Sequence, residues 1–73
     1  MDDLLEINES ERMRREAVAD RLRALADMLA RHNEVAFTRE GLRYSVRVPD
    51  EVEYSFEIEI GEDGSEVEIE IKW

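Results

Sequence analysis

EVEYSFEIEIGEDGSEVEIEIKW, residues 51–73, is the stretch that decides the fold of this 73-residue chain. Apolar and acidic side chains alternate along it, on both sides of an interruption at residues 61–65 that contains two glycines. The apolar positions are Val52, Tyr54, Phe56, Ile58, Ile60, Val67, Ile69, Ile71 and Trp73. Because successive side chains of a β-strand point to opposite faces, this alternation predicts a hairpin with one apolar and one acidic face.

The register of the hairpin follows from its two faces. Both strands must point their apolar side chains to the same side, which restricts the residues that can lie opposite each other. The predicted pairs are Val52 with Trp73, Glu53 with Lys72, Tyr54 with Ile71, Phe56 with Ile69, Glu57 with Glu68, and Ile58 with Val67. A shift of one residue would carry carboxylates onto the apolar side.

Residues 12–32 show the periodicity of a helix. Their apolar stripe consists of Val18, Leu22, Leu25 and Leu29. This spacing of four, three and four residues is typical of one face of an α-helix. Ser10 is the expected N-cap, since a hydroxyl can accept a hydrogen bond from the first turn. Asn33 is expected to end the helix in the left-handed conformation.

Three further strands are expected around this helix. The first covers residues 3–8, and a hairpin covers residues 34–38 and 42–48. Pro49 should end the pairing there, because proline has no N–H to donate. The order strand, helix, four strands predicts a single α+β domain, residues 1–73, in which one amphipathic helix packs on one face of a mostly antiparallel β-sheet.

The formal net charge of −10 is concentrated at one end of the chain. Residues 1–48 hold ten acids and nine arginines, whereas residues 49–73 hold ten acids and one base, Lys72. An acidic field repels nucleic-acid phosphate and anionic membranes, so neither is expected as a partner. A surface rich in carboxylate and poor in lysine suits concentrated salt, where the Debye length falls to ~3 Å at 1 M. The composition therefore predicts a halophilic protein.

Catalytic chemistry is not indicated by any residue set in the sequence. The chain has no cysteine, and His32 is its one histidine, placed at the expected helix end. No serine has a base to activate it in sequence reach. We therefore expect no enzyme activity and no cofactor. The N-terminus does not read as a signal peptide, and no stretch approaches the ~20 apolar residues of a membrane span, so the cytoplasm is the expected location.

The acidic face of the terminal hairpin is the one constellation that suggests binding. Opposed residues of a hairpin have Cβ atoms ~4.5–5.5 Å apart, so four carboxylates would form a square. The candidates for binding a hard cation such as Ca²⁺ or Mg²⁺ are Glu57, Glu59, Glu66 and Glu68. A solvated, salt-adapted face and a docking face for a basic protein are the competing interpretations. Arg43 and Arg47 are expected to project to the same face and to neutralise part of it.

A known family is similar to this sequence. Residues 49–54, the alternation that follows, and the ending EVEIEIKW at residues 66–73 resemble the amphi-Trp domain, a group of very small proteins found largely in halophilic archaea and some bacteria. The opening of the helix at residues 13–17 is similar too, although members often have Ser where Arg14 stands. The resemblance implies this fold and habitat, and it supplies no activity and no catalytic residues.

Two functions are consistent with the sequence. The first is a non-catalytic interaction module, whose partner-binding candidates are Trp73, Glu57 and Glu68 and whose partner would be a basic protein or a second copy of the chain. The alternative is a divalent-cation-binding protein. Trp73 itself has two interpretations: it can cover the end of the core, or it can anchor a partner, because Trp is enriched among interface hot spots.

Overall fold

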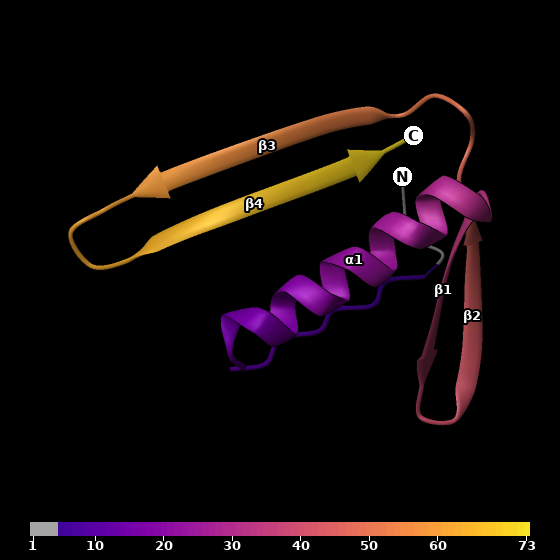
Figure 1. Ribbon diagram of the computed structural model, residues 1–73, viewed down its shortest axis with the longest axis horizontal. Coiled ribbons are helices and arrows are strands. Elements are labelled where there is room, and N and C mark those ends of the chain that lie inside the picture. The colour runs from indigo at the N-terminus through magenta and orange to yellow at the C-terminus, as the bar shows by residue number, and fades with distance from the viewer. Residues whose placement is uncertain (1–4) are drawn as a thin grey trace.

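The computed structural model describes residues 5–73, and in this range it contains one helix and four strands (Figure 1). The elements are α1 (Arg15–Arg31), β1 (Glu34–Arg39), β2 (Leu42–Arg47), β3 (Glu53–Ile60) and β4 (Ser65–Lys72). The α+β class predicted from the sequence is confirmed. The strands, however, form two separate antiparallel hairpins, β1–β2 and β3–β4, in place of one sheet.

The break between the two hairpins lies at residues 48–52. The Val48 N–H donates to the Asn33 carbonyl oxygen at 2.8 Å, which extends the pairing of β1 and β2 by one step. Pro49 follows and cannot donate to a ladder, as the sequence predicted. The chain then turns away and begins β3 without a partner in the first hairpin. Val48 is 8% exposed, and it is the only buried residue among residues 5–73.

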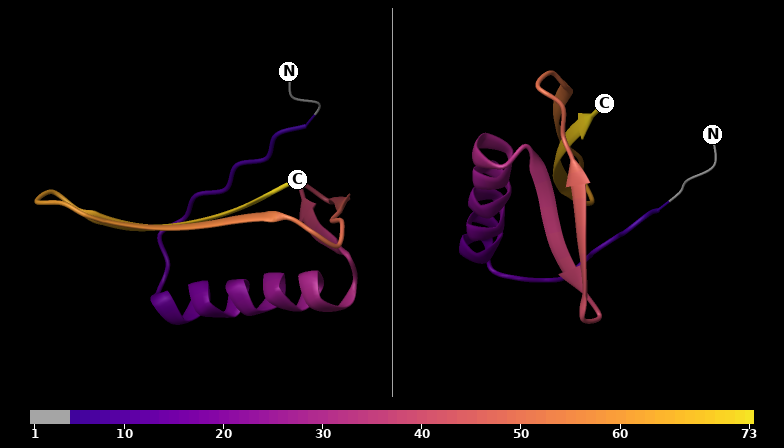
Figure 2. Two further views of the ribbon diagram at one scale, coloured as in Figure 1. Left: turned by 90° about the horizontal axis from the view of Figure 1, so that it is seen from above. Right: turned by 90° about the vertical axis from the view of Figure 1, so that its right-hand side faces the viewer.

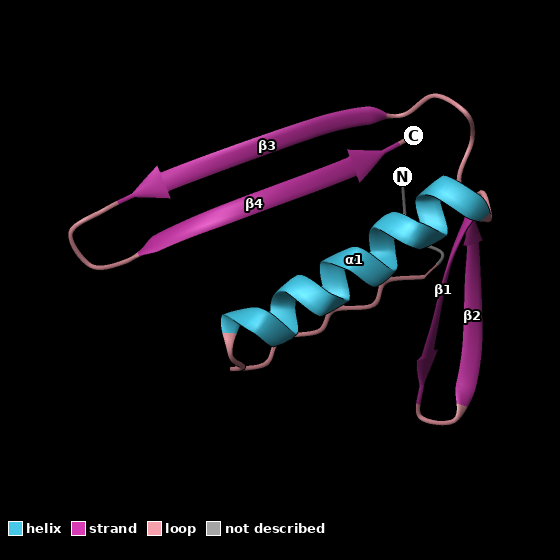
Figure 3. Ribbon diagram, viewed as in Figure 1, coloured by secondary structure: helices cyan, strands magenta, loops and turns pink. Residues whose placement is uncertain are grey.

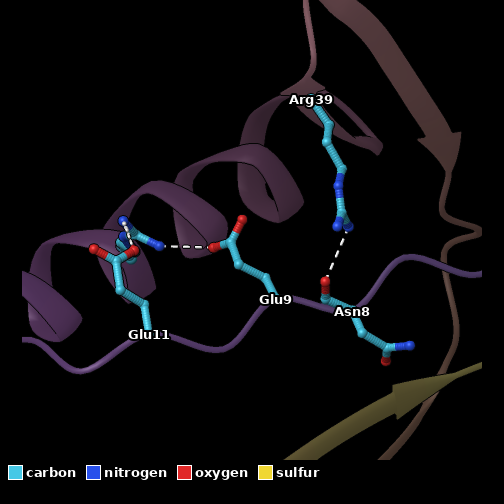
Figure 4. Close-up of polar contacts among 5 residues, drawn as sticks. Asn8, Glu9, Glu11 and Arg39 are labelled. Carbon is cyan, nitrogen blue, oxygen red and sulfur yellow. Dashed lines mark hydrogen bonds and ion pairs between the residues drawn. The ribbon is translucent and has the colours of Figure 1, made fainter.

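The predicted strand at residues 3–8 is not formed where the structure describes it. Residues 3 and 4 lie outside the described range, and residues 5–8 pair with no strand (Figure 3). Side chains attach this segment to the rest of the molecule, since Arg39 donates to the Asn8 carbonyl oxygen at 2.9 Å (Figure 4). Two apolar residues, Leu5 and Ile7, were too short a pattern to specify a strand.

Arg21 of α1 also holds the N-terminal segment. Its guanidinium lies 2.6 Å from a Glu9 oxygen and 3.4 Å from a Glu11 oxygen (Figure 4). These two carboxylates precede the helix in the chain, so the ion pairs fold residues 9–11 back along α1. The expected helix start at residue 12 is therefore wrong: α1 begins at Arg15, and Arg14 is its N-cap in place of Ser10.

The end of α1 agrees with the prediction. Asn33 has a φ of 53°, the left-handed conformation that stops a helix. His32 is the C-cap, and its backbone N–H bonds the Met28 carbonyl oxygen at 3.0 Å. Arg31 occupies the last turn, where the helix dipole favours a cation.

Packing around α1 is confined to its C-terminal half. Leu25 and Leu29 are half-buried, and α1 lies against β1, whereas Val18 and Leu22 are 41% and 47% exposed. No Cα atom of β3 or β4 lies within 8 Å of a Cα atom of α1, β1 or β2. The helix therefore covers part of the first hairpin and none of the second, and this corrects the prediction of a helix packed across one continuous sheet.

Candidate functional site on the terminal hairpin

The register of β3 and β4 agrees with the sequence prediction. Ile58 lies opposite Val67, and Glu57 lies opposite Glu68. The other predicted pairs within the strands, Glu53 with Lys72, Tyr54 with Ile71, and Phe56 with Ile69, are also formed. The pair of Val52 with Trp73 lies one residue beyond the observed ladder. The hairpin thus has the two chemically different faces that the alternation predicted.

The apolar face of this hairpin is exposed along its length. We define it as Val52, Tyr54, Phe56, Ile58, Ile60, Val67, Ile69, Ile71 and Trp73. Ile58 is 57% exposed, Ile60 at the tip is 82% exposed, and Ile71 is half-buried. Figure 2 shows the tip of the hairpin extending beyond the start of α1, at the end farthest from β1 and β2. In other proteins, large exposed apolar patches occur at protein–protein and membrane interaction sites and in ligand-binding grooves.

Trp73 ends the apolar face on the side of the hairpin nearest the body of the molecule. Its side chain is 59% exposed, and Val52, its neighbour by register, is 41% exposed. The indole therefore does not close the core within a single chain as a buried lid would. Its role as a partner anchor stays a prediction.

The opposite face of the hairpin carries the carboxylates. We define this acidic face as Glu53, Ser55, Glu57, Glu59, Glu66, Glu68, Glu70 and Lys72. Two carboxylate pairs are directly opposed, Glu57 with Glu68 and Glu59 with Glu66. Like charges placed opposite each other in a hairpin destabilise it, since their Cβ atoms are ~4.5–5.5 Å apart. Lys72 lies 3.7 Å from Glu70 and supplies an ion pair at the open end.

The four cation candidates share this face, but they do not form a closed site. A shallow hollow of about 140 Å³ is lined by Ser55, Glu57, Glu68 and Glu70. A second hollow, at the tip, is lined by Glu59 and Glu66 together with Gly64 and Ser65. Within residues 5–73, no group of three or more carboxylate, imidazole or thiol side chains is gathered closely enough to hold a metal ion. Cation binding by Glu57, Glu59, Glu66 and Glu68 stays a prediction.

The predicted neutralisation by Arg43 and Arg47 is wrong. These arginines belong to β2, where Arg43 lies opposite Thr38 and Arg47 lies opposite Glu34. No ion pair joins either of them to the acidic face in the part of the chain that the structure describes. The cause is the break at Pro49, which places β2 and β3 in different sheets.

His32 lies where the sequence placed it, at the end of α1. It borders an open hollow together with Met28, Glu34, Ala36 and Arg43. His32 is exposed, and among residues 5–73 no hydrogen bond or ion pair joins its imidazole to Glu34 or Arg43. The hollow is a surface depression between the end of α1 and the first hairpin, and both apolar and charged side chains line it.

Sequence reasoning missed the exposure of the apolar face. The sequence contained a signal for this exposure. The apolar face has nine apolar positions, whereas the helical stripe that was expected to cover it has four. Four stripe residues from Val18 to Leu29 also had to cover β1 and β2. A comparison of these two surfaces would have indicated that one helix is too small for both hairpins.

The fold defines a class of small α+β domains whose terminal hairpin, β3–β4, has one apolar and one acidic face. The family model for the Amphi-Trp domain matches residues 1–73, and the chain belongs to this family. Curated proteins and solved structures give no significant match. In the described range, α1 has neither the length nor the apolar character needed to cross a membrane.

Proposed function

We propose that the chain is a small non-catalytic interaction module. Its β3–β4 hairpin presents the apolar face to a partner protein, and the acidic face stays in solvent. The observation that carries this proposal is the exposure of the apolar face, on which Phe56 is 52% and Tyr54 is 63% exposed. A two-stranded hairpin is marginally stable by itself in water, so contact with a partner would also stabilise it.

The acidic face supports a proposal about the environment of the module. We infer that it acts in the cytoplasm of a cell with a high salt concentration. Screening by molar salt weakens the repulsion between Glu57 and Glu68 and between Glu59 and Glu66, and carboxylates keep the surface hydrated. The same face is the alternative docking surface, since a basic protein could bind carboxylates that Arg43 and Arg47 do not reach.

Photo-cross-linking from the two faces tests this function. A photoreactive phenylalanine replaces either Phe56, on the apolar face, or Ser55, its neighbour on the acidic face, in cells that contain molar salt. We expect one discrete cross-linked product from position 56 and none from position 55. A product from position 55 alone would move the docking surface to the acidic face. The absence of any product from both positions would contradict the proposed function.

A further inference from the structure

We propose that the partner of the apolar face is a second copy of this chain, and that the two β3–β4 hairpins pack face to face with the tip of each over the open end of the other. This inference rests on the proposed function and names its partner. The assembly is a two-fold symmetric dimer, in which the same surface of each copy forms the interface.

The exposed area of the chain is large for its mass. It exposes 7332 Å², whereas a folded monomer of 8.6 kDa is expected to expose roughly 4,700 Å². The excess of roughly 2,600 Å² is more than the ~800 Å² that each partner contributes to an interface of standard size. Eight of the thirteen large apolar side chains that are exposed lie within residues 52–73. The exposed apolar side chains are therefore concentrated on the terminal hairpin.

The part of the apolar stripe of α1 that is left exposed is shorter than this hairpin. Val18 and Leu22 are the exposed members of its apolar stripe, and they span about 6 Å along the helix axis. Each strand of the hairpin has eight residues, which extend for about 27 Å. A second hairpin of the same length and with the same apolar face provides the matching surface.

The charges disfavour pairing of the hairpins through their edges. A two-fold antiparallel pairing of β4 with its copy would place Glu66, Glu68 and Glu70 beside the same residues of the partner. Like charges directly opposite each other are destabilising, and the apolar face would stay exposed. Face-to-face packing separates the two sheets by about 10 Å and leaves both acidic faces on the outside.

The charges also select the relative direction of the two hairpins. The tip carries Glu62 and Asp63 in its loop. The open end carries Lys72 and the acids Asp50, Glu51 and Glu53, and it lies on the side of the molecule where α1 and β2 end, at Arg31 and Arg47 (Figure 1). With the two tips together, four loop carboxylates would approach one another. With each tip over the partner's open end, the loop acids lie toward the arginine-bearing end, and Ile60 is brought near Val52 of the partner subunit.

Sedimentation of the purified full chain in molar KCl tests the dimer. We expect a mass of twice 8.6 kDa for the wild type. Phe56→Glu, at the centre of the apolar face, should return the mass to that of a monomer. Leu42→Glu is the matched control, because Leu42 is 60% exposed on β2 and lies outside the apolar face, so this variant should remain a dimer. A wild type that sediments as a monomer at every concentration would overturn the inference.

Cysteine cross-linking tests the arrangement without relying on the stability of Phe56→Glu. The chain has no cysteine, so single-cysteine variants label one position. A bismaleimide that spans about 10 Å, the spacing of packed sheets, should join Ile60→Cys to Val52→Cys when the two variants are mixed. Ile60→Cys alone and Leu42→Cys alone should give little product. Efficient coupling of Ile60→Cys to itself would overturn the tip-over-end arrangement.

These experiments distinguish failure of the proposed dimer from failure of the proposed function. If the wild type is a monomer in sedimentation and position 56 still cross-links to another protein in cells, the dimer is wrong and the interaction module stands. If position 56 gives no product and hydrogen exchange shows a protected hairpin in a monomer, the hairpin has closed on its own chain. That result would overturn both proposals.

Discussion

Arg14 occupies the N-cap of α1 and cannot perform the task of that position. Its φ of −69° and ψ of 148° are the extended values that an N-cap adopts, yet no side-chain hydrogen bond caps the helix. A guanidinium only donates hydrogen bonds, whereas the N–H groups of the first turn need an acceptor. The contact of Arg14 with Glu16 at 3.8 Å is solvent-exposed and contributes little.

Replacement of Arg14 by Ser is expected to stabilise the chain. A serine hydroxyl can accept a hydrogen bond from the first turn, and an N-cap of this kind contributes about 1 kcal/mol. The midpoint of urea unfolding should rise for Arg14→Ser. Arg12→Ser is the control, because residue 12 precedes the cap and lies outside the helix. Equal effects of the two substitutions would show that loss of an arginine, and not capping, is responsible.

The β1–β2 turn contains two residues in the left-handed conformation. Glu40 has a φ of 53° and Gly41 has a φ of 79°, which is the pattern of a type I′ hairpin turn. Gly41→Ala should lower the free energy of unfolding by about 1–2 kcal/mol, because the left-handed region is costly for a residue with a Cβ. Gly64→Ala in the other hairpin is the control, since Gly64 has no left-handed φ and open space around its Cβ position. Chemical denaturation of both variants provides the comparison, and a neutral Gly41→Ala would contradict the turn assignment.

At the level of elements, the sequence predicted what depends on local pattern. The register of β3 and β4 is correct because a slip of one residue would place Glu57 among the apolar side chains. The position of Asn33 is correct because few residues accept a positive φ. The start of α1 is wrong: residues 9–11 lie back along the helix, where Glu9 and Glu11 pair with Arg21, a contact that no local pattern reveals. The prediction of one continuous sheet is wrong because joining the two hairpins depends on tertiary packing.

The opposed carboxylates of the acidic face make a prediction for the hairpin. Two charges ~5 Å apart repel by roughly 1 kcal/mol in bulk water, and exposure to solvent keeps the effect near that size. Glu57→Gln combined with Glu68→Gln should therefore raise the thermal midpoint in dilute buffer and reduce its dependence on KCl. Glu51→Gln combined with Glu62→Gln is the matched control, since it removes the same charge outside the ladder. A wild-type midpoint that does not change with salt would argue against salt adaptation.

For the molecule as a whole, the decisive property is its open shape. The radius of gyration is 14.3 Å, whereas a domain of 73 residues is expected near ~11 Å. Sequence patterns predicted each face correctly, but they could not show which surface would cover the apolar side of β3 and β4. That choice depends on distances between elements, and the linker at residues 48–52 sets them. The candidate face was thus predictable residue by residue. The number of apolar positions indicated that one helix could not cover both hairpins, but not which hairpin would stay exposed.

Trp73 provides a direct measure of what covers the hairpin. It is the only tryptophan of the chain, and it lies at the end of the apolar face with 59% of its side chain exposed in one copy. If two copies pack as proposed, dilution should dissociate them and shift Trp73 fluorescence to longer wavelength, because the indole then enters water. Mass action also requires the thermal midpoint to fall with protein concentration.

The variants separate this behaviour from that of a lid within one chain. Phe56→Glu should show the long-wavelength emission at every concentration, and Leu42→Glu should follow the wild type. Trp73→Ala should weaken association by a factor of at least ten, since an anchoring aromatic side chain commonly contributes 2 kcal/mol or more to an interface. A lid predicts the opposite pattern: short-wavelength emission that is independent of concentration, and a Trp73→Ala variant that loses stability as a monomer. Fluorescence and sedimentation on the same dilution series therefore decide whether the indole of Trp73 packs against its own chain or against a second copy.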